Sequence, residues 1–112
     1  MARGVSRGEI WMYRFAPPDK RRPVLVLSRQ AALGVLRTAI VAPITSTIHR
    51  IPSEVPVGTA EGLKVESVVN LDHIYTVPQN ELRTFVGVLG ADAMRAVCRA
   101  LATATGCATS DA

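Results

Sequence analysis

The apolar residues of this chain fall in short runs of strand length, and this pattern limits the fold to a small β-rich one. Arg22–Ser28 is almost continuously apolar, which is typical of a strand covered on both faces. Thr38–Thr45 repeats the pattern, although Pro43 requires a strand edge, a bulge or a strand end because it has no N–H. Arg22–Ser28 is therefore predicted to be the central strand, with a backbone irregularity beside Thr45.

Other segments have the composition of strands and are bounded by turn-forming residues. Glu9–Phe15 is rich in β-forming residues, and the prolines within residues 16–19 end it. A connection through Gly34 separates the next two runs. Turn residues then divide the remaining sequence into four further predicted strands, Ser53–Val57, Val65–Leu71, Ile74–Val77 and Thr84–Leu89.

Only the C-terminal segment has helical spacing. Its predicted buried face consists of Met94, Val97, Cys98, Leu101 and Thr105, with Asp92 in the first turn and Gly106 as the stop. The predicted fold class is mostly β: a strongly bent antiparallel sheet or half-open barrel with one C-terminal helix packed on it. We expect a single domain over residues 1–112, with a frayed tail from about residue 108.

The charge of the chain favours anionic partners. The 112 residues include 13 Lys and Arg against 9 Asp and Glu, which gives a net charge of +4. Only Lys20 and Lys64 are lysines, so eleven of these cations are arginines, the side chain best suited to bidentate contacts with phosphate. A solubility role explains the same charge equally well. With 4% aromatic residues, a broad platform for base stacking is not expected.

Several classes of site are excluded by the motifs. Two cysteines cannot form a disulfide scaffold, and with two histidines they match no zinc-ligand spacing; Cys98 is expected to be a buried small apolar residue. There is no phosphate-binding glycine loop, no zinc-protease motif and no nucleophile elbow. No signal sequence or membrane span is evident, so we expect a cytoplasmic protein that uses no metal or cofactor.

Polar residues cluster at the ends of the predicted strands, namely in residues 20–22, in residues 45–47, and at Asn70 and Asp72. RNA transesterification requires such groups, because the 2′-hydroxyl must lose a proton while the phosphorus gains negative charge. A guanidinium and hydroxyls stabilise that charge, but arginine is a poor proton acceptor. A carboxylate is the more natural base.

Each of these residues also has a purely structural interpretation. Arg21 and Arg22 can be solvated loop cations, residues 45–47 can form an ordinary hydrogen-bonded turn, and Asp72 can bind local backbone N–H groups. By the same reasoning His73 is expected to be a packed core histidine, and His49 an exposed loop residue.

Four segments in order resemble the MazF/PemK toxin family: Arg7–Trp11, Arg22–Ser28, Ile40–Ser46 and Val68–Ile74. The resemblance extends from about residue 7 to residue 104. It implies an SH3-like, half-open antiparallel β-barrel of the MazF/PemK/CcdB type. It also implies a homodimeric toxin of a bacterial type II toxin–antitoxin module that cleaves single-stranded RNA without metal, leaving 2′,3′-cyclic phosphate and 5′-hydroxyl ends. The implied partner is an acidic, MazE-like antitoxin lying across the dimer groove.

The resemblance also implies roles for individual residues. Arg22 corresponds to the family's arginine at the scissile phosphate and in proton transfer, Thr45 to its phosphate-binding threonine, and Asp72, with less support, to an acidic site residue. The loop at residues 16–21 is shorter than in many members and lacks a glutamate that some carry, so Asp72 ranks above Asp19 as the base. Contacts to RNA are expected from Lys20, Arg21, Ser28, Arg29, Ser46 and Asn70.

Two rival functions remain open at this point. One is a gyrase-poisoning toxin of the same fold, although that group typically ends in Trp-Gly-Ile and this chain ends in Thr-Ser-Asp-Ala. The other is a non-catalytic SH3-like module that binds nucleic acid. The cleavage sequence and the class of RNA attacked depend on loop shapes that periodicity does not predict.

Overall fold

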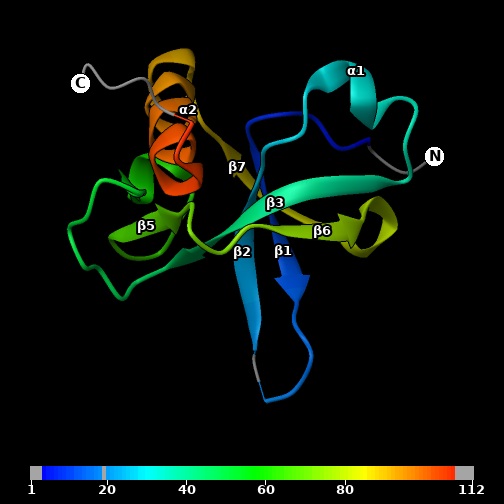
Figure 1. Cartoon of the computed structure of the whole chain (residues 1–112). Helices are drawn as coiled ribbons and strands as arrows, with labels where there is room; N and C mark the ends of the chain where they lie inside the picture. Colours follow the sequence, from blue (N-terminus) through cyan, green and yellow to red (C-terminus); the bar gives the residue numbers. More distant parts are fainter. Residues whose placement is uncertain (1–3, 19, 108–112) are drawn as a thin grey trace.

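A computed structural model describes residues 4–18 and 20–107; Asp19 and the tail from residue 108, for which the sequence makes predictions, lie outside the described residues. The described chain forms a curled antiparallel sheet with one long helix (Figure 1). None of the described helices is long and apolar enough to cross a membrane. The strands are β1 (Glu9–Arg14), β2 (Arg21–Val26), β3 (Thr38–Thr45), β4 (Glu54–Val57), β5 (Ser67–Asn70), β6 (Tyr75–Pro78) and β7 (Thr84–Val88).

The strand β2 is central, as its apolar run predicts. The sheet order is β4-β5-β3-β2-β1-β7, and β6 pairs with β3. Alternate residues of β2 enter two separate apolar clusters: Leu25 packs on the face that helix α2 (Ala91–Thr105) covers, and Val24 and Val26 pack on the other face. A strand buried on both faces needs apolar residues at consecutive positions. The predicted mostly β half-barrel with one C-terminal helix is confirmed.

The proline in β3 sits where the strand changes partner. Residues 38–41 of β3 pair with β6, and residues 44–45 pair with β5. The Leu27 N–H donates to the Ile40 carbonyl, so by the alternation of an antiparallel ladder Pro43, opposite Val24, faces away from β2. Its missing N–H therefore falls in the gap between β5 and β6 and removes no ladder bond. Pro43 therefore lies at a local edge of the sheet, one of the alternatives that its missing N–H predicts. The expected backbone irregularity is not found, because β3 runs unbroken from Thr38 to Thr45 and keeps regular register with β2.

Helix α2 buries a face slightly different from the predicted one. Val97 and Ala100 are buried, and Met94 and Leu101 pack against the same cluster. The prediction that Cys98 is buried is wrong, and Thr105 is also exposed. Small alanines take these places on the packed face, because they allow the helix to approach the sheet closely. The helix ends at Gly106 in the left-handed conformation, with φ 74°, as predicted.

Three short helical turns were not expected from the sequence. They are α1 (Gln30–Leu33), η1 (Thr59–Glu61) and η2 (Gln79–Glu81), and each is too short to show helical periodicity. The turn η1 packs against β7 at Gly87, where a Cβ atom would lie 1.9 Å from the Glu61 carbonyl oxygen. Glycine therefore allows η1 to cover the side of the barrel that no strand pairing closes.

Candidate active site

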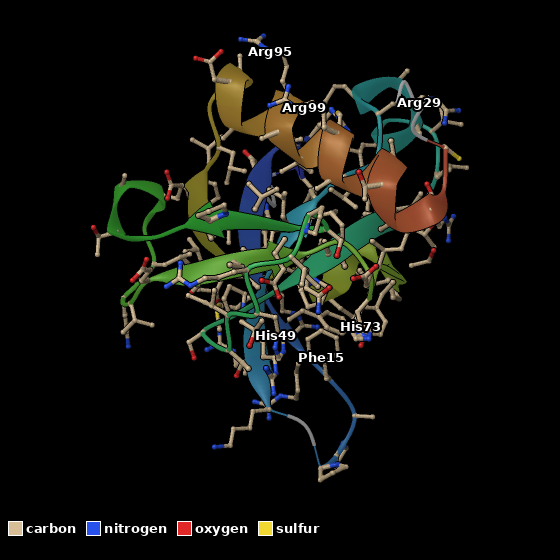
Figure 2. The ribbon with its side chains drawn as sticks, turned by 60° about the vertical axis from the view of Figure 1, so that its left-hand side comes forward. Phe15, Arg29, His49, His73, Arg95 and Arg99 are labelled. Carbon is tan, nitrogen blue, oxygen red and sulfur yellow. The ribbon has the colours of Figure 1, made fainter. Side chains whose placement is uncertain are left out.

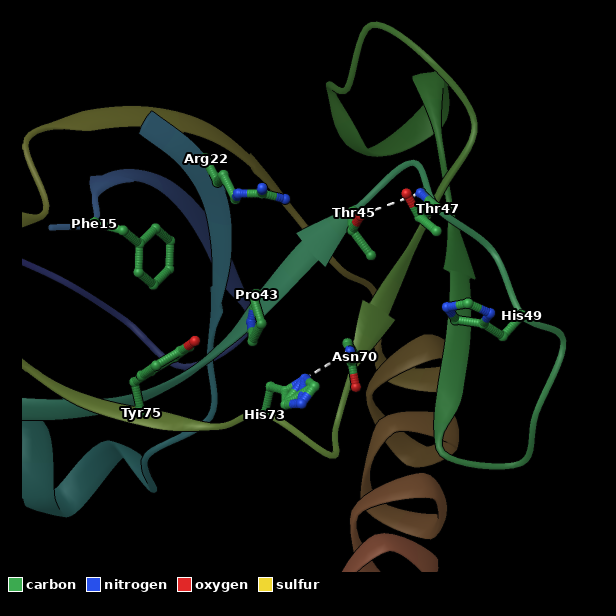
Figure 3. Close-up of a pocket in the computed structure, with 9 residues that line it drawn as sticks. All are labelled: Phe15, Arg22, Pro43, Thr45, Thr47, His49, Asn70, His73 and Tyr75. Carbon is green, nitrogen blue, oxygen red and sulfur yellow. Dashed lines mark hydrogen bonds between the residues drawn. The ribbon is translucent and has the colours of Figure 1, made fainter. Parts of the chain in front are cut away.

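A cavity of about 260 Å³ opens where β2, β3, β5 and β6 separate, on the sheet face opposite helix α2. We call it the Arg22 cleft (Figure 3). Pro43 forms part of its wall, so the cleft occupies the gap in which β3 changes partner. Its lining residues come from strands β2, β3, β5 and β6 and from the segments next to them: Phe15, Arg22, Pro43, Thr45, Thr47, His49, Asn70, His73 and Tyr75.

The alternation of side chains along the strands brings the polar residues together. Arg22 stands opposite Tyr13 in the β1–β2 ladder and shares the face of Val24. Thr45 follows Pro43 by two residues on β3, and Asn70 follows Val68, the partner of Thr45, by two residues on β5. All of these positions point to the face away from α2. Three residues from distant parts of the sequence therefore meet without any special backbone geometry.

Arg22 is exposed at the start of β2, and its guanidinium points across the cleft toward Thr45 (Figure 3). The Thr45 hydroxyl oxygen accepts a hydrogen bond from the Thr47 N–H at 3.1 Å. This is the hydrogen-bonded turn that the sequence offered as the structural interpretation of residues 45–47. The bond orients the hydroxyl and leaves its proton available for a phosphate oxygen, so a turn and a phosphate site coexist here.

His73 lines the cleft and is exposed, so the prediction of a packed core histidine is wrong. The segment from residue 71 to residue 74 joins β5 to β6, which pair with β3 on either side of the gap. The segment therefore spans the gap and holds His73 beside Pro43. The side-chain nitrogen of Asn70 lies 3.1 Å from Nδ1 of His73, and its oxygen accepts the Asp72 N–H at 2.9 Å.

The carboxylate of Asp72 is directed elsewhere. It accepts a hydrogen bond from the Ser53 hydroxyl, and Asp72 is not among the residues lining the cleft. The predicted role of Asp72 as a base thus has no direct path to a phosphate placed between Arg22 and Thr45. Its role remains a prediction.

His49 reaches the cleft from the loop after β3 and is exposed, as expected. The buried carboxylate of Glu54 accepts hydrogen bonds from the backbone N–H groups of His49, at 3.0 Å, and Arg50, at 2.9 Å. Arg50 adopts a positive φ of 57°, a conformation that residues other than glycine rarely take. One buried acid therefore fixes the course of the loop that presents His49.

A larger cavity of about 770 Å³ adjoins the cleft on the α2 side of the sheet, and we call it the barrel mouth. Arg22, Thr45 and Thr47 line both cavities, so they form the ridge between them. The barrel mouth adds Arg21, Ser46, Lys64 and the ring of Phe85, among others. Arg21 donates to the Thr84 hydroxyl at 2.8 Å. A polyanionic strand lying over the ridge can therefore meet cations and hydroxyls on both sides.

Some predicted RNA contacts lie away from this region. Ser28 is buried, and its hydroxyl accepts the Ile40 N–H at 2.7 Å. Arg29 is exposed before α1, on a different side of the molecule from His49 and His73 (Figure 2). Lys20 is exposed in the loop before β2 but lines neither cavity. In the sequence, Ser28 and Arg29 follow the apolar run just as Arg21 and Arg22 precede it, so the sequence does not show which end of the strand lies at the cleft.

Thr47 belongs to the predicted polar cluster at residues 45–47, but the sequence did not identify His49, His73 and two aromatic residues as cleft residues. Phe15 contacts Tyr75 with ring centroids 5.1 Å apart, and both line the cleft. The available signal was the alternation of residues 45, 47 and 49, which extends the period of β3 past its end. For His73 no local signal exists, because its position depends on the pairing of β5 and β6 with the same strand.

Potential metal ligands are not clustered in the part of the chain that the structure describes. No group of three or more His, Cys, Asp or Glu among the described residues could hold a metal ion. Burial, together with the neighbouring Glu81 carboxylate and its hydrogen bond, raises the pKa of Tyr13. That phenol therefore stays protonated, and it lies outside the Arg22 cleft.

The fold and the cleft together define a small basic β-barrel protein that presents cationic and hydroxyl donors at the ends of its strands. A family model described as PemK-like, MazF-like toxin of type II toxin–antitoxin system matches residues 6–105. A probable endoribonuclease of Mycobacterium tuberculosis, MazF5, is 43% identical over 103 residues, which cover 91% of this chain and 94% of that protein. The chain belongs to the PemK/MazF toxin family.

Solved structures agree with this assignment. The Mycobacterium tuberculosis toxin MazF-mt6 superimposes with a TM-score of 0.82 at 35% identity, covering 90% of this chain and 99% of that one. An endoribonuclease in complex with its cognate antitoxin, from a mycobacterial species, has a TM-score of 0.82 at 27% identity and covers 94% and 98%. The likeness spans the whole half-barrel.

Proposed function

We propose that this chain is an endoribonuclease toxin that cleaves single-stranded RNA at the ridge between the Arg22 cleft and the barrel mouth. Membership in the PemK/MazF family and the endoribonuclease relatives support this activity. The observation that carries the proposed site is the convergence of the Arg22 guanidinium and the Thr45 hydroxyl from two strands on one cavity. We further propose that the chain acts as a single domain without a metal cofactor.

The chemistry follows from these two groups. The 2′-oxygen of a ribose attacks the adjacent phosphorus while the bond to the 5′-oxygen breaks, which yields a 2′,3′-cyclic phosphate and a 5′-hydroxyl end. Negative charge grows on the non-bridging oxygens in the transition state. The Arg22 guanidinium and the Thr45 hydroxyl donate to those oxygens and stabilise that charge. Arg21, Ser46, Lys64 and Asn70 hold the flanking nucleotides on either side of the ridge.

The test is cleavage of a labelled single-stranded RNA by the purified protein in EDTA. We expect discrete fragments with 2′,3′-cyclic phosphate and 5′-hydroxyl ends, identified by mass spectrometry. The control is the same RNA with deoxyribose at the mapped site, which has no 2′-hydroxyl and resists cleavage. Binding of RNA without fragments from any sequence would instead favour the nucleic-acid-binding module, and inhibition of gyrase without RNA cleavage would favour the gyrase-poisoning toxin.

The proposed setting is the bacterial cytoplasm, where the toxin forms a homodimer that an acidic antitoxin neutralises. A related endoribonuclease has been solved with its cognate antitoxin. Two copies of a chain of charge +4 double the positive charge, which attracts both RNA and an acidic peptide. The antitoxin is therefore expected to compete with RNA, and to bind less tightly as salt rises. Simultaneous binding of the antitoxin and an uncleavable RNA with undiminished affinity would contradict a shared surface.

A further inference from the structure

Among the residues lining the Arg22 cleft, few can accept a proton from the attacking 2′-hydroxyl. A guanidinium has no acceptor atom, and the Tyr75 side chain offers a phenol, which is a poor proton acceptor. The Asp72 carboxylate is bonded to Ser53 and lies outside the cleft lining. The two imidazoles, His49 and His73, remain, and imidazole is the side chain that most often moves protons near neutral pH.

The hydrogen bonds around His73 determine its form. The Asp72 backbone N–H can only donate, so the atom of Asn70 that faces it at 2.9 Å is the amide oxygen. The amide nitrogen of Asn70 then faces Nδ1 of His73 at 3.1 Å. Because that nitrogen can only donate, Nδ1 accepts, and the ring proton resides on Nε2. In this arrangement Asn70 orients the His73 ring and Nε2–H is left to donate to a ligand.

His49 is in the opposite situation. Its backbone is fixed by Glu54, but none of the hydrogen bonds found among the described residues involves its ring nitrogens. The ring nitrogens of His49 are therefore uncommitted, and the ring points into the cleft from the side opposite Arg22 (Figure 3). Glu54 thus fixes the backbone that carries His49, while the ring nitrogens of His49 are left to contact a ligand.

We propose that His49 is the general base of the reaction and that His73 is a hydrogen-bond donor oriented by Asn70; this inference rests on the proposed function. His49 takes the proton of the 2′-hydroxyl as the bond from O2′ to phosphorus forms. The bond from phosphorus to O5′ breaks, its electron pair stays on O5′, and O5′ takes a proton from water. The imidazolium returns its proton to the hydroxide that results. Nε2–H of His73 donates to a phosphate oxygen throughout.

The first experiment separates the two histidines by the same conservative substitution. Glutamine keeps an amide donor but cannot act as a base, so His49→Gln is expected to lower kcat by about 10² to 10⁴-fold with little change in KM. His73→Gln retains a donor and is expected to lose less than about tenfold. Both residues are exposed, so unchanged melting temperatures should accompany both variants. Near-normal kcat in His49→Gln, or an equal loss from both variants, overturns the assignment.

The second experiment tests the role of His49 directly. Added imidazole is expected to restore cleavage to His49→Ala and not to Arg22→Ala, because only the former lacks a base. An RNA with sulfur in place of O5′ at the scissile bond has a leaving group that needs no proton. If His49→Ala cleaves that RNA at the wild-type rate, His49 is the acid and the proposal is wrong. If the wild-type protein cleaves no RNA at all, the proposed function fails; wild-type cleavage with an unaffected His49→Ala refutes only this inference.

Discussion

At one end of the β2–β3 pair, Arg22 and Thr45 meet in an open cleft, whereas at the other end Ser28 and Arg29 follow the same strand without forming one. The difference lies in what the backbone requires. At the far end Ser28 accepts the Ile40 N–H, and the amide of Gln79 donates to the Leu36 and Thr38 carbonyls at 2.9 and 3.0 Å. Polar side chains there complete the hydrogen bonds of the fold.

At the cleft end the flanking strands diverge instead. The strand β3 leaves β6 after Val41 and joins β5 at Ile44, and Pro43 removes the one backbone donor that would need a partner in the gap. The polar side chains around it therefore keep capacity for a ligand. This contrast indicates that a strand end becomes a site where its neighbouring strands separate. Thr45 accepts the Thr47 N–H there but keeps its own proton for a ligand, whereas Ser28 is buried against the Ile40 N–H.

The largest expected effect is at Arg22. Arg22→Ala should lower cleavage by about 10³-fold or more, since the main charge facing the phosphorane is lost, and an exposed arginine contributes little to stability. Arg22→Lys should also be impaired, because an ammonium cannot donate in a bidentate fork. Single-turnover rates measure the loss, with the exposed Arg99→Ala on helix α2 as the matched control. Comparable rates in Arg22→Ala and Arg99→Ala would contradict the site.

Thr45→Val should come next, with a reduction of about 10² to 10³-fold, the effect of one lost transition-state donor. The side chain keeps its shape, but the Thr47 N–H loses its acceptor; both groups are near solvent, so the melting temperature should change little. The measurement is the cleavage rate at saturating RNA. A loss confined to RNA affinity, with normal cleavage of the bound complex, would show that Thr45 binds RNA without acting in the chemical step.

Glu54→Ala probes the loop that presents His49. Removing the buried carboxylate leaves two backbone N–H groups without their acceptor, which should lower the free energy of unfolding by about 1 to 3 kcal/mol. We expect about a tenfold loss of kcat as well, because the loop then samples other conformations. Urea unfolding and cleavage rates test the two effects separately. A destabilised variant with full kcat would show that the loop conformation does not matter for the reaction.

The smallest effect on cleavage is expected from Ser28→Ala, which sharpens the contrast between the two ends. The Ile40 N–H loses its buried acceptor, so the free energy of unfolding should fall by about 1 to 3 kcal/mol. The cleavage rate of the folded protein should fall far less than in Thr45→Val. If Ser28→Ala lost as much cleavage as Thr45→Val while its stability was unchanged, Ser28 would have to contact RNA, as the sequence predicts.

Much of the fold is determined by local pattern. The runs Arg22–Ser28 and Thr38–Thr45, the turn signals between the later strands and the stop at Gly106 all predict elements that the structure contains, because strand and helix periodicities are properties of neighbouring residues. Local pattern failed for the single turn α1 and for Cys98. The helix α1 is a single turn, which is too short to show helical periodicity. In α2, alanines lie on two adjacent faces, so the sequence does not determine which of these faces is buried.

The site divides in the same way. The sequence by itself placed Arg22, Thr45 and Asn70 at the ends of predicted strands, because the apolar runs and the polar residues beside them are neighbours in the chain. That the three side chains share one face of the sheet follows from the pairing of β2, β3 and β5. Only the tertiary structure decided that His49 and His73 flank them, and that Asp72 and Ser28 are engaged elsewhere. These outcomes depend on which strands pair with β3 and where they part. Strand pairing between distant segments is a property of the whole sheet, and no local pattern encodes it.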